Sequence, residues 1–507
     1  MFSPSYPSIT PFRSIGLLSL FLLGGALQAL MLPKVSAGLA VAANWYVDQN
    51  AGGANNGATW ADAFTDLQDA LTVAVAGEQI WVAQGVYKPT PSTVPTISFV
   101  LKDGVAIYGG FPAGGGDGTI LSGDIDSNDV NTDGNSVAET TGDLVGINTN
   151  HVLTANGTSL TAILDGFVVT AGNGDQGGGL RLESGSLTVS NCGFSGNAAT
   201  NAGGGIYNAS ANPIITNCWF NGNSANLGGG MANFTSDPVV NHCSFLSNSA
   251  STWGGGMGNR SSNPAVTECV FSQNISADSG AGLLNLISSN GTFTRCSFLE
   301  NSSPAAAGAY NVFADPTFIN CSFSGNIALS GGGGGVWNIT STATYTNCVF
   351  SGNHSNGSGG AAINSSNTAG APTFTNCTFT GNSALSDGSA LNNSLSSPPL
   401  VNCVLWANGP GVSIANSGAT VTISYSLVQL SNGSGASWDP ALGVDGGNNI
   451  DIDPTFVRSA DPGDGDWTTV ADNDYGDQRL LAGSGAFDVG SNGANLEPLD
   501  RAGNTRI

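Results

Sequence analysis

The chain has 507 residues, of which only 9% are charged and 8% are aromatic, and it contains 74 glycines. This composition argues against a compact helical protein or a coiled coil and indicates turn-rich β structure. The 35 acidic residues outnumber the 11 Lys and Arg residues, which gives a formal net charge of −24. We therefore expect no binding to nucleic acid or to an anionic membrane surface, because both require clustered positive charge.

Residues 1–43 are typical of a secretory signal peptide. Arg13 precedes an apolar run over residues 15–32, and small residues follow up to Ala42. This order predicts cleavage near residues 37 to 43. The alternative is an uncleaved membrane anchor, because the run is at the lower limit of a spanning length. No second hydrophobic stretch follows, so we expect a mature chain with no membrane span that is secreted or held at the cell surface, in the outer membrane or extracellular space.

Residues 44–176 are expected to form an N-terminal cap and the first coils of the repeat structure that follows. The apolar spacing over Phe64–Leu71 predicts a short amphipathic helix. Short strands are expected over residues 80–87 and again over residues 99–108. A helix at this place would cover the open end of a stacked β structure, whose edges would otherwise be exposed.

Within this segment, residues Asp129–Asp133 match the beginning of a calcium-binding loop. Acidic and amide residues alternate there and Gly134 follows, but Glu139 arrives one position too early for the usual twelfth ligand. The sequence therefore permits a Ca²⁺-ordered loop near Asp129–Asp133. A solvated turn rich in Asp and Asn is the alternative. No other cofactor is expected.

Residues 177–430 contain a regular repeat of about 26 residues, marked by one cysteine in each copy at intervals of 25 to 29 residues. A fixed period of this length is typical of a solenoid, in which each repeat buries its apolar face against its neighbours. One cysteine at the same phase of every repeat predicts an interior column of free, inert thiols. Disulfides are not expected, because parallel side chains are poorly aimed for bonding. The nine cysteines are Cys192, Cys218, Cys243, Cys269, Cys296, Cys321, Cys348, Cys377 and Cys403.

Each repeat places apolar residues three positions before and two positions after its cysteine. Cys and the residue two positions later share one face of a strand, but an offset of three would reverse the face. A bend is therefore predicted between them, at the residue just before Cys, which is Asn in six repeats and His242, Glu268 or Arg295 in the others. Asn tolerates the left-handed backbone conformation that such a bend requires.

Two further asparagine columns are predicted. The first lies three positions after the aromatic residue, and stacked asparagines can hydrogen-bond along such a column. A Gly-rich turn then leads to the second column, which consists of Asn208, Asn233, Asn259, Asn285, Asn311, Asn338, Asn364 and Asn392. Proline recurs five residues before Cys in six repeats, as expected at a corner outside the ladders. Three short strands and three turns would fit each repeat, so the fold class predicted is all-β, a right-handed parallel β-helix solenoid with a short N-terminal capping helix.

Residues 431–507 are expected to form an acidic C-terminal capping segment. Aspartates cluster between Asp461 and Asp477, and the chain later runs through Gly483–Gly490 to Asp500–Asn504. The aspartate cluster shows less pattern than the loop near Asp129, and a solvated turn would explain it as well.

These motifs resemble known families. The Phe-x-x-Asn step followed by Gly-Gly-apolar is similar to the repeats of polymorphic outer-membrane proteins and of right-handed β-helix proteins of the pectate-lyase-like superfamily. The C-terminal motifs resemble the closing segment of choice-of-anchor Q proteins. The resemblance implies a bacterial surface or secreted chain, and it covers the fold far better than any activity, because this superfamily includes lyases, hydrolases, adhesins and inert surface proteins. The absence of a sorting motif or hydrophobic tail favours free secretion over anchoring.

Candidate chemistry is sparse in the repeat region. Asp278 with Glu300, or Glu268 with Arg295 in the next repeat, could converge on one face, and a solvated ion pair is the simpler interpretation of the latter. His151, His242 and His354 lie far apart and belong to no metal or nucleophile motif. No residue is therefore predicted to be catalytic, cofactor-binding or metal-binding.

The function predicted from sequence is that of an exported, non-catalytic β-helix protein, acting in adhesion or in binding glycans or cell-envelope components, as a monomer. The near-uncharged repeats, rich in Asn, Ser and Thr, suit neutral sugars. The alternative is a polysaccharide lyase or glycoside hydrolase of the pectate-lyase-like superfamily, and a purely structural envelope protein is a third possibility.

Overall fold

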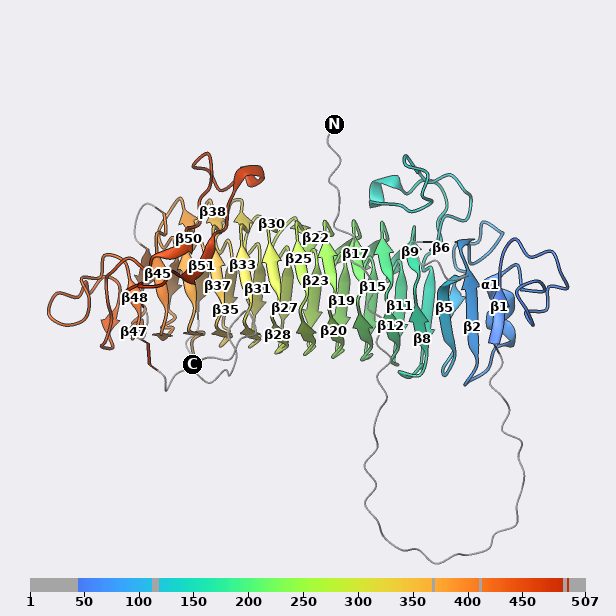
Figure 1. The fold of residues 1–507 in the computed structure, drawn as a ribbon, viewed down its shortest axis with the longest axis horizontal. Helices are drawn as coiled ribbons and strands as arrows, with labels where there is room; N and C mark the ends of the chain where they lie inside the picture. The colour runs from blue at the N-terminus through green and yellow to red at the C-terminus, as the bar shows by residue number, and fades with distance from the viewer. Residues whose placement is uncertain (1–43, 112–117, 367–369, 410–412, 487–489, 492–507) are drawn as a thin grey trace, which may run out of the picture. The chain divides into compact units, whose positions relative to one another are not determined.

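The computed structural model describes residues 44–111, 118–366, 370–409, 413–486 and 490–491. The predicted signal peptide, residues 1–43, lies outside these residues. Short strands wind into successive coils, and equivalent strands of neighbouring coils pair in parallel (Figure 1). Within the part of the chain that is described, no helix is long and apolar enough to cross a membrane.

One helix, α1 (Leu67–Val73), lies at the N-terminal end of the coils. Asp66 caps it by accepting a hydrogen bond from the backbone N–H of Gln68. Leu67, Ala70 and Leu71 are buried against the first strands. The predicted capping helix is therefore confirmed, although it starts after Phe64, which instead forms a β-bridge with Val47.

Sheet A has 15 strands among the residues described and carries the apolar residue that precedes each cysteine by three positions. In the nine repeats this residue is the buried centre or start of its strand. The strands are β1 (Asn44–Val47), β2 (Gln79–Ala83), β5 (Ala106–Phe111), β8 (Ile163–Asp165), β12 (Thr188–Ser190), β16 (Ile214–Thr216), β20 (Val239–Asn241), β24 (Ala265–Thr267), β28 (Thr292–Thr294), β32 (Thr317–Ile319), β36 (Thr344–Thr346), β40 (Thr373–Thr375), β44 (Leu400–Val401), β47 (Thr422–Ser424) and β49 (Val444–Asp445).

Sheet B has 13 strands in the described part of the chain and carries the residue two positions after each cysteine, which is Phe in eight repeats and Leu405 in the ninth. The rings point inward and stack from coil to coil; the Phe245 and Phe271 centroids lie 4.7 Å apart with the rings inclined by 3°. The strands are β3 (Gly85–Tyr87), β6 (Thr119–Ser122), β9 (Val168–Thr170), β13 (Gly193–Ser195), β17 (Trp219–Asn221), β21 (Ser244–Leu246), β25 (Val270–Ser272), β29 (Ser297–Leu299), β33 (Ser322–Ser324), β37 (Val349–Ser351), β41 (Thr378–Thr380), β45 (Val404–Trp406) and β48 (Leu427–Val428).

Sheet C has nine strands in the described residues and corrects the prediction of three strands per coil, because the coils that contain it have four. It begins just after the buried Asn that ends the turn following sheet B. Its signal was a small residue, Ala or Ser, two positions after that Asn, such as Ala225 or Ser276, which is buried. The strands are β10 (Asn173–Gln176), β14 (Ala198–Ala202), β18 (Ser224–Leu227), β22 (Ser249–Trp253), β26 (Ile275–Ser276), β30 (Ser302–Ser303), β34 (Ile327–Ala328), β38 (His354–Ser355) and β42 (Ser383–Ala384).

Sheet D has 12 strands within the described ranges and closes each coil before sheet A begins again. The strands are β4 (Phe99–Val100), β7 (Leu153–Asn156), β11 (Leu180–Glu183), β15 (Ile206–Ala209), β19 (Met231–Phe234), β23 (Met257–Arg260), β27 (Leu283–Leu286), β31 (Ala309–Val312), β35 (Val336–Ile339), β39 (Ala362–Ser365), β43 (Leu391–Ser394) and β46 (Ile414–Ser417). The second asparagine column lies on this sheet and is buried, but its eighth member is Asn393 rather than the predicted Asn392. Nδ2 of Asn364 donates to Oδ1 of Asn393, 29 residues later. This repeat is three residues longer than the 26-residue norm, and the prediction placed the last asparagine of the column one residue too early.

The predicted bend before each cysteine is confirmed in all nine repeats. The residue there has φ between 52° and 57° whether it is Asn, His242, Glu268 or Arg295. The left-handed residue turns the chain from sheet A to sheet B, so that the inward faces of both strands point into one core. The predicted proline corner is confirmed too: Pro213 and Pro238 stand just before sheet A strands, and their carbonyls accept from the next coil.

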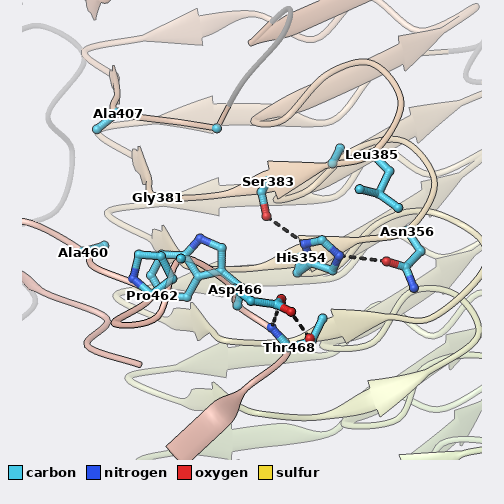
Figure 2. A pocket seen from close by; sticks show the side chains of 14 residues that line it. His354, Asn356, Gly381, Ser383, Leu385, Ala407, Ala460, Pro462, Asp466 and Thr468 are labelled. Atoms are coloured by element: carbon cyan, nitrogen blue, oxygen red, sulfur yellow. Dashed lines mark hydrogen bonds between the residues drawn. The ribbon is translucent and has the colours of Figure 1, made fainter. Parts of the chain in front are cut away.

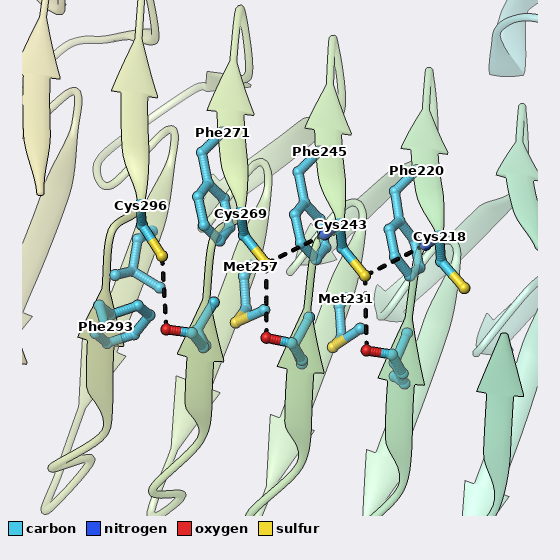
Figure 3. Packing of buried hydrophobic residues seen from close by; sticks show 14 of the residues in the cluster. Cys218, Phe220, Met231, Cys243, Phe245, Met257, Cys269, Phe271, Phe293 and Cys296 are labelled. Carbon is cyan, nitrogen blue, oxygen red and sulfur yellow. Dashed lines mark hydrogen bonds between the residues drawn. The ribbon is translucent and has the colours of Figure 1, made fainter. Parts of the chain in front are cut away.

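The cysteines form the predicted interior column of free thiols (Figure 3). Each is at most 2% exposed. The Sγ of Cys269 lies 3.3 Å from the carbonyl of Thr267 and 3.6 Å from that of Val240, where it donates weakly. Burial raises the pKa of Cys192 to about 12 and holds that of Cys321 well above its ordinary value. Such thiols are poor nucleophiles, because the thiolate is the reactive form.

The asparagine column at the turn between sheets B and C is a continuous buried hydrogen-bond ladder. Asn274 accepts at Oδ1 from both the backbone N–H and the Nδ2 of Asn248, at 3.0 and 3.1 Å. Its own Nδ2 donates to Asn301 Oδ1 and to the carbonyl of Phe245. Each amide therefore uses both of its N–H groups and its oxygen, and the predicted stacking of these residues is confirmed. The column consists of Asn197, Asn223, Asn248, Asn274, Asn301, Asn326, Asn353, Asn382 and Asn408.

A first prediction concerns the thiols. In the native protein none of the nine cysteines should react with Ellman's reagent, and all nine should react in guanidinium chloride without added reductant. Colour development against time measures both values. Fewer than nine thiols in the denatured sample would show disulfides, and fast reaction of the native protein would show that the column is not interior.

A second prediction concerns the ladder. Asn274→Ala should lower the free energy of unfolding by about 3 kcal/mol, because it leaves the backbone N–H and one Nδ2 hydrogen of Asn248 buried without an acceptor. Asn241→Ala is the control, since Asn241 is half-buried on the outer face of β20, and its effect should stay within about 0.5 kcal/mol. Urea unfolding followed by circular dichroism gives both values, and equal losses would contradict the ladder's role.

Candidate functional site

The C-terminal segment leaves the coils and returns along their outer surface. Its strands β50 (Phe456–Arg458) and β51 (Asp477–Leu480) pair antiparallel, the one such pairing among the named strands of the described residues. Between them, residues 459–476 pass over the turns that join sheets B and C (Figure 1). The hydroxyl of Tyr475 lies 3.2 Å from Oε1 of Glu300, which is 175 residues earlier in the sequence. We call residues 459–476 the strap.

Glycine marks the turns that the strap covers. The residue before each buried ladder asparagine is left-handed, and it is Gly325, Gly352 and Gly381 beneath the strap. A Cβ at Gly325 would lie 2.2 Å from the Tyr475 hydroxyl, and one at Gly352 would lie 2.5 Å from the Trp467 ring. A side chain therefore cannot be present at Gly325 or Gly352, where the strap lies directly on the turn. Ser247, Gln273 and Ala407 occupy the same position with φ between 51° and 55° in other coils.

A second excursion uses the same surface nearer the N-terminus. A Cβ at Gly196 would lie 2.4 Å from the carbonyl oxygen of Ala138, and one at Gly222 would lie 1.9 Å from that of Glu139. The loop that follows β6 therefore rests on glycine turns, as the strap does. The turns between these two contact regions, from Ser247 to Glu300, carry side chains instead.

A cleft of about 780 Å³ lies between the strap and the outer face of sheet C (Figure 2). This volume is in the range of small-molecule and oligosaccharide sites. Polar groups enter it from both walls: His354, Asn356 and Ser383 from the coils, and Asp466 and Thr468 from the strap. Its apolar part consists of Leu385, Ala384, Ala407, Ala460, Pro462 and the edge of Trp467.

His354 is the central polar group of the cleft. It stands on β38, is 8% exposed, and hydrogen-bonds through both ring nitrogens. Nδ1 lies 2.8 Å from Oγ of Ser383 on the adjacent strand β42, and Nε2 lies 2.8 Å from Oδ1 of Asn356. Figure 2 shows the three side chains in line on the sheet, facing the strap.

The strap wall is held by local hydrogen bonds. Oδ1 of Asp466 accepts from the backbone N–H and the hydroxyl of Thr468, which lowers the pKa of the Asp466 carboxyl below its ordinary value. Trp467 is buried on the glycine turns and stacks on Tyr475 at 6.0 Å between centroids. The carboxylate of Asp466 therefore stays ionised at neutral pH and faces the cleft.

The bend positions of three neighbouring coils form an ion-pair chain. The carboxylate of Glu268 contacts His242 on one side and Arg295 on the other, where the Arg295 NH2 group lies 2.6 Å from Oε1. The hydrogen bond from Arg295 lowers the pKa of the Glu268 carboxyl. All three side chains are more than a third exposed, so the geometry fits the solvated ion pair predicted from the sequence.

The other sequence candidates are not brought together. Asp278 accepts from Nε1 of Trp253 at the end of sheet C, whereas Glu300 accepts from Gln273 and Tyr475 at the turn before it. His151 is half-buried and bonds to the carbonyl of Gly177. Burial lowers the pKa of its imidazole, which favours the neutral form.

The proposed calcium loop is tied down by the protein itself. Asp129 accepts from the backbone N–H of Val145 and from Nδ2 of Asn148, both at 2.6 Å, and Asp133 accepts from Asn135. Over the stretches of chain that the structure describes, no three His, Cys, Asp or Glu side chains are grouped closely enough to hold a metal ion. The carboxylates thus accept hydrogen bonds from N–H groups of the turn, as the solvated-turn alternative requires. A calcium ion near Asp129–Asp133 stays a prediction.

Comparison with known proteins bears on the fold. Residues 171–315 match a family model described as the right handed beta helix region. Together with the parallel ladders, this match confirms the predicted fold class, a right-handed parallel β-helix. No curated protein matches the chain in sequence.

Several solved structures are similar to the chain at low identity. Pectate lyase Pel9A is 14% identical, with 93% of this chain and 98% of that chain covered and a TM-score of 0.35. Pectin methylesterase PemA from Erwinia chrysanthemi is 10% identical, with 54% and 81% covered and a TM-score of 0.30. PfbA, a surface adhesin of Streptococcus pneumoniae, is 9% identical, with 70% and 88% covered and a TM-score of 0.27. These similarities assign no activity to this chain.

A third prediction tests the docking of the strap. Gly352→Ala should loosen it, because the new Cβ would collide with Trp467 and the left-handed backbone would cost about 1 to 2 kcal/mol. Trypsin should then cut after Arg458 or Arg479, which flank the strap, at least severalfold faster than in the parent protein. Ser247→Ala is the matched control, since Ser247 is a left-handed residue at the same turn of another coil. An unchanged digestion rate for Gly352→Ala would show that the strap is not held at these turns.

Proposed function

We propose that the chain is an exported protein of the cell surface or the extracellular medium that binds glycans or cell-envelope components without cutting the polysaccharide chain. The single observation that carries this proposal is the cleft between the strap and sheet C. It combines a volume of about 780 Å³ with neutral hydrogen-bonding groups and small apolar side chains on both walls.

The charge pattern favours a neutral ligand. Among the residues that the structure describes, no Lys or Arg lines the cleft, and the one carboxylate there, that of Asp466, would repel uronates and phosphates. The repeats outside the cleft carry only Arg181, Arg260 and Arg295 as basic residues between 177 and 430. Neutral sugars remain, because their hydroxyls match Asn, Ser and Thr, and their apolar faces match residues such as Leu385.

Cleavage of a glycosidic bond is the less favoured alternative. A glycoside hydrolase of the usual kind needs two carboxyl groups about 5 to 10 Å apart. The cleft is lined by one, Asp466, and the acidic residues of the repeats are used in separate local contacts. A polysaccharide lyase or hydrolase would be revealed by release of reducing or unsaturated sugars from a glycan panel, with and without Ca²⁺.

Several finer points belong to the same proposal. We infer that residues 1–43 are a cleaved secretory signal, that the coils are repeats of the polymorphic outer-membrane-protein type, and that the C-terminal segment is of the choice-of-anchor Q type. The Phe-x-x-Asn and Gly-Gly-apolar motifs support the repeat type. We also propose that the protein is a monomer and that a calcium ion binds near Asp129–Asp133. Mass spectrometry of the exported protein would test the cleavage point of the signal.

A fourth prediction tests binding in the cleft. On a glycan array, the parent protein should bind a neutral oligosaccharide, and Leu385→Ala should weaken that binding about fivefold, because about 1 kcal/mol of apolar contact is lost. Leu385 is 73% exposed at the cleft, and Leu430 is a matched control because it is 78% exposed and is not among the residues that line it. Equal binding by Leu385→Ala and Leu430→Ala would place the ligand elsewhere.

A further inference from the structure

We propose that Ser383 is a nucleophile activated by His354, and that the cleft thereby removes small acyl groups from esters. The inference is drawn from the hydrogen-bond chain that joins Ser383, His354 and Asn356 at the floor of the cleft. This inference rests on the proposed function in one respect, namely that a glycan supplies the alcohol part of the ester. The acyl-transfer chemistry itself stands on this geometry alone.

The direction of each hydrogen bond is fixed by the last member of the chain. Nδ2 of Asn356 donates to the carbonyl of Leu329 at 2.9 Å, so Oδ1 is the atom that faces His354. An amide oxygen can only accept, and Nε2 of His354 must therefore carry the proton. In the neutral imidazole the other ring nitrogen, Nδ1, is then unprotonated and accepts from the hydroxyl of Ser383. This tautomer is the one in which imidazole can take the serine proton.

The hydroxyl is placed where a substrate can reach it. Ser383 and His354 occupy equivalent positions of paired strands β42 and β38, on the outer face of sheet C. Both line the cleft, whose far wall is the strap, while neighbouring backbone hydrogen bonds hold each strand in its ladder. The nucleophile and its base are therefore presented by a rigid sheet, which favours a fixed attack geometry.

This pairing is a departure from the repeat and not a product of it. The same outward position in successive coils reads Ala198, Ser224, Ser249, Ile275, Ser302, Ile327, His354 and Ser383. Ser224, Ser249 and Ser302 hold this position with no histidine at the equivalent position of either neighbouring coil. Only at the end of the series does a serine stand beside a histidine, and this is the place where the strap forms a cleft.

The reaction follows from these roles. Oγ of Ser383 attacks the ester carbonyl carbon while its proton passes to Nδ1 of His354. The tetrahedral intermediate expels the alcohol, which takes the proton from Nδ1 as the C–O bond breaks, and an acyl-serine remains. A water molecule then gives a proton to Nδ1 and attacks the acyl carbon. The bond to Oγ breaks, Ser383 regains its proton, and the carboxylic acid leaves. Asn356 is a positioning residue, because it acts through the tautomer of His354.

The walls define the ester class. Asp466 faces the same space and disfavours anionic acyl groups, and the small residues Ala407 and Gly409 leave room for a short acyl chain. A cleft of about 780 Å³ also admits a sugar unit as the alcohol. The structure thus points to uncharged esters with a short acyl group, such as O-acetylated neutral sugars.

The test uses the mature, exported protein and two small probes, a fluorophosphonate that labels activated serines and p-nitrophenyl acetate. We expect labelling at Ser383, located by mass spectrometry, and ester hydrolysis that falls about 100-fold or more in Ser383→Ala and His354→Phe. Ser302→Ala is the matched control, because Ser302 holds the same outward position between Ile275 and Ile327. It should leave both readouts unchanged.

Asn356 is tested by its effect on the histidine tautomer. Asn356→Leu should slow labelling of Ser383 at least tenfold, and Asn356→Asp, which keeps an acceptor at the same place, should restore it. Circular dichroism confirms that each variant is folded. Failure to label Ser383 in folded parent protein, or equal labelling of Ser302, would overturn the inference. Binding to the glycan array without labelling would overturn it while leaving the proposed function intact, and labelling without glycan binding would do the reverse.

Discussion

The asparagine ladder between sheets B and C is the interaction on which the coil depends. A turn at that corner buries backbone N–H groups and carbonyls that no sheet can pair, and each would cost about 1 to 3 kcal/mol if left unsatisfied. Asn is short enough to reach both neighbouring coils. Its oxygen accepts from the backbone and side chain of the coil before, and its nitrogen donates to the coil on either side. The corner is therefore hydrogen-bonded in the same way from one coil to the next.

This constraint explains why so much of the fold could be predicted from the sequence. The cysteine and phenylalanine columns, the left-handed residue between sheets A and B, and the ladder itself each depend on contacts with the same position one repeat away. A period in sequence then maps directly onto a stack in space. Even His242, Glu268 and Arg295 adopt the predicted backbone conformation, because the bend is imposed by the phase of the inward faces and not by the side chain.

The predictions were wrong at two places where the repeat departs from three strands and 26 residues per coil. Sheet C was not predicted because its strands are short and run directly into the Gly-rich stretch, so that the two together also fit one long turn. Its small inward residues were visible as Ala or Ser two places after the ladder asparagine, as at Ala250. Asn392 was predicted in place of Asn393 in a repeat that contains additional residues. The member of the second column is the asparagine whose side chain faces inward, and there it is Asn393.

The cleft could not be predicted from the sequence, for a different reason. His354 and Ser383 are 29 residues apart, and Asp466 is a further 83 residues on, so no local motif joins them. One signal existed. Glycine before the ladder asparagine recurs in groups, at Gly196 and Gly222 and again from Gly325 to Gly381, and those groups coincide with the two segments that rest on the coils.

The same logic separates scaffold from function in this molecule. Inward positions are repeated because each must fit an identical neighbour above and below, so a change there disturbs three coils at once. Outward positions have no such requirement and can hold Ile327, His354 and Ser383 in succession on one ladder. A solenoid can therefore acquire a site at any coil without altering its core, provided that a covering segment supplies the second wall. Here the strap supplies that wall, and the glycine turns beneath it are the feature of the coils that allows it to dock.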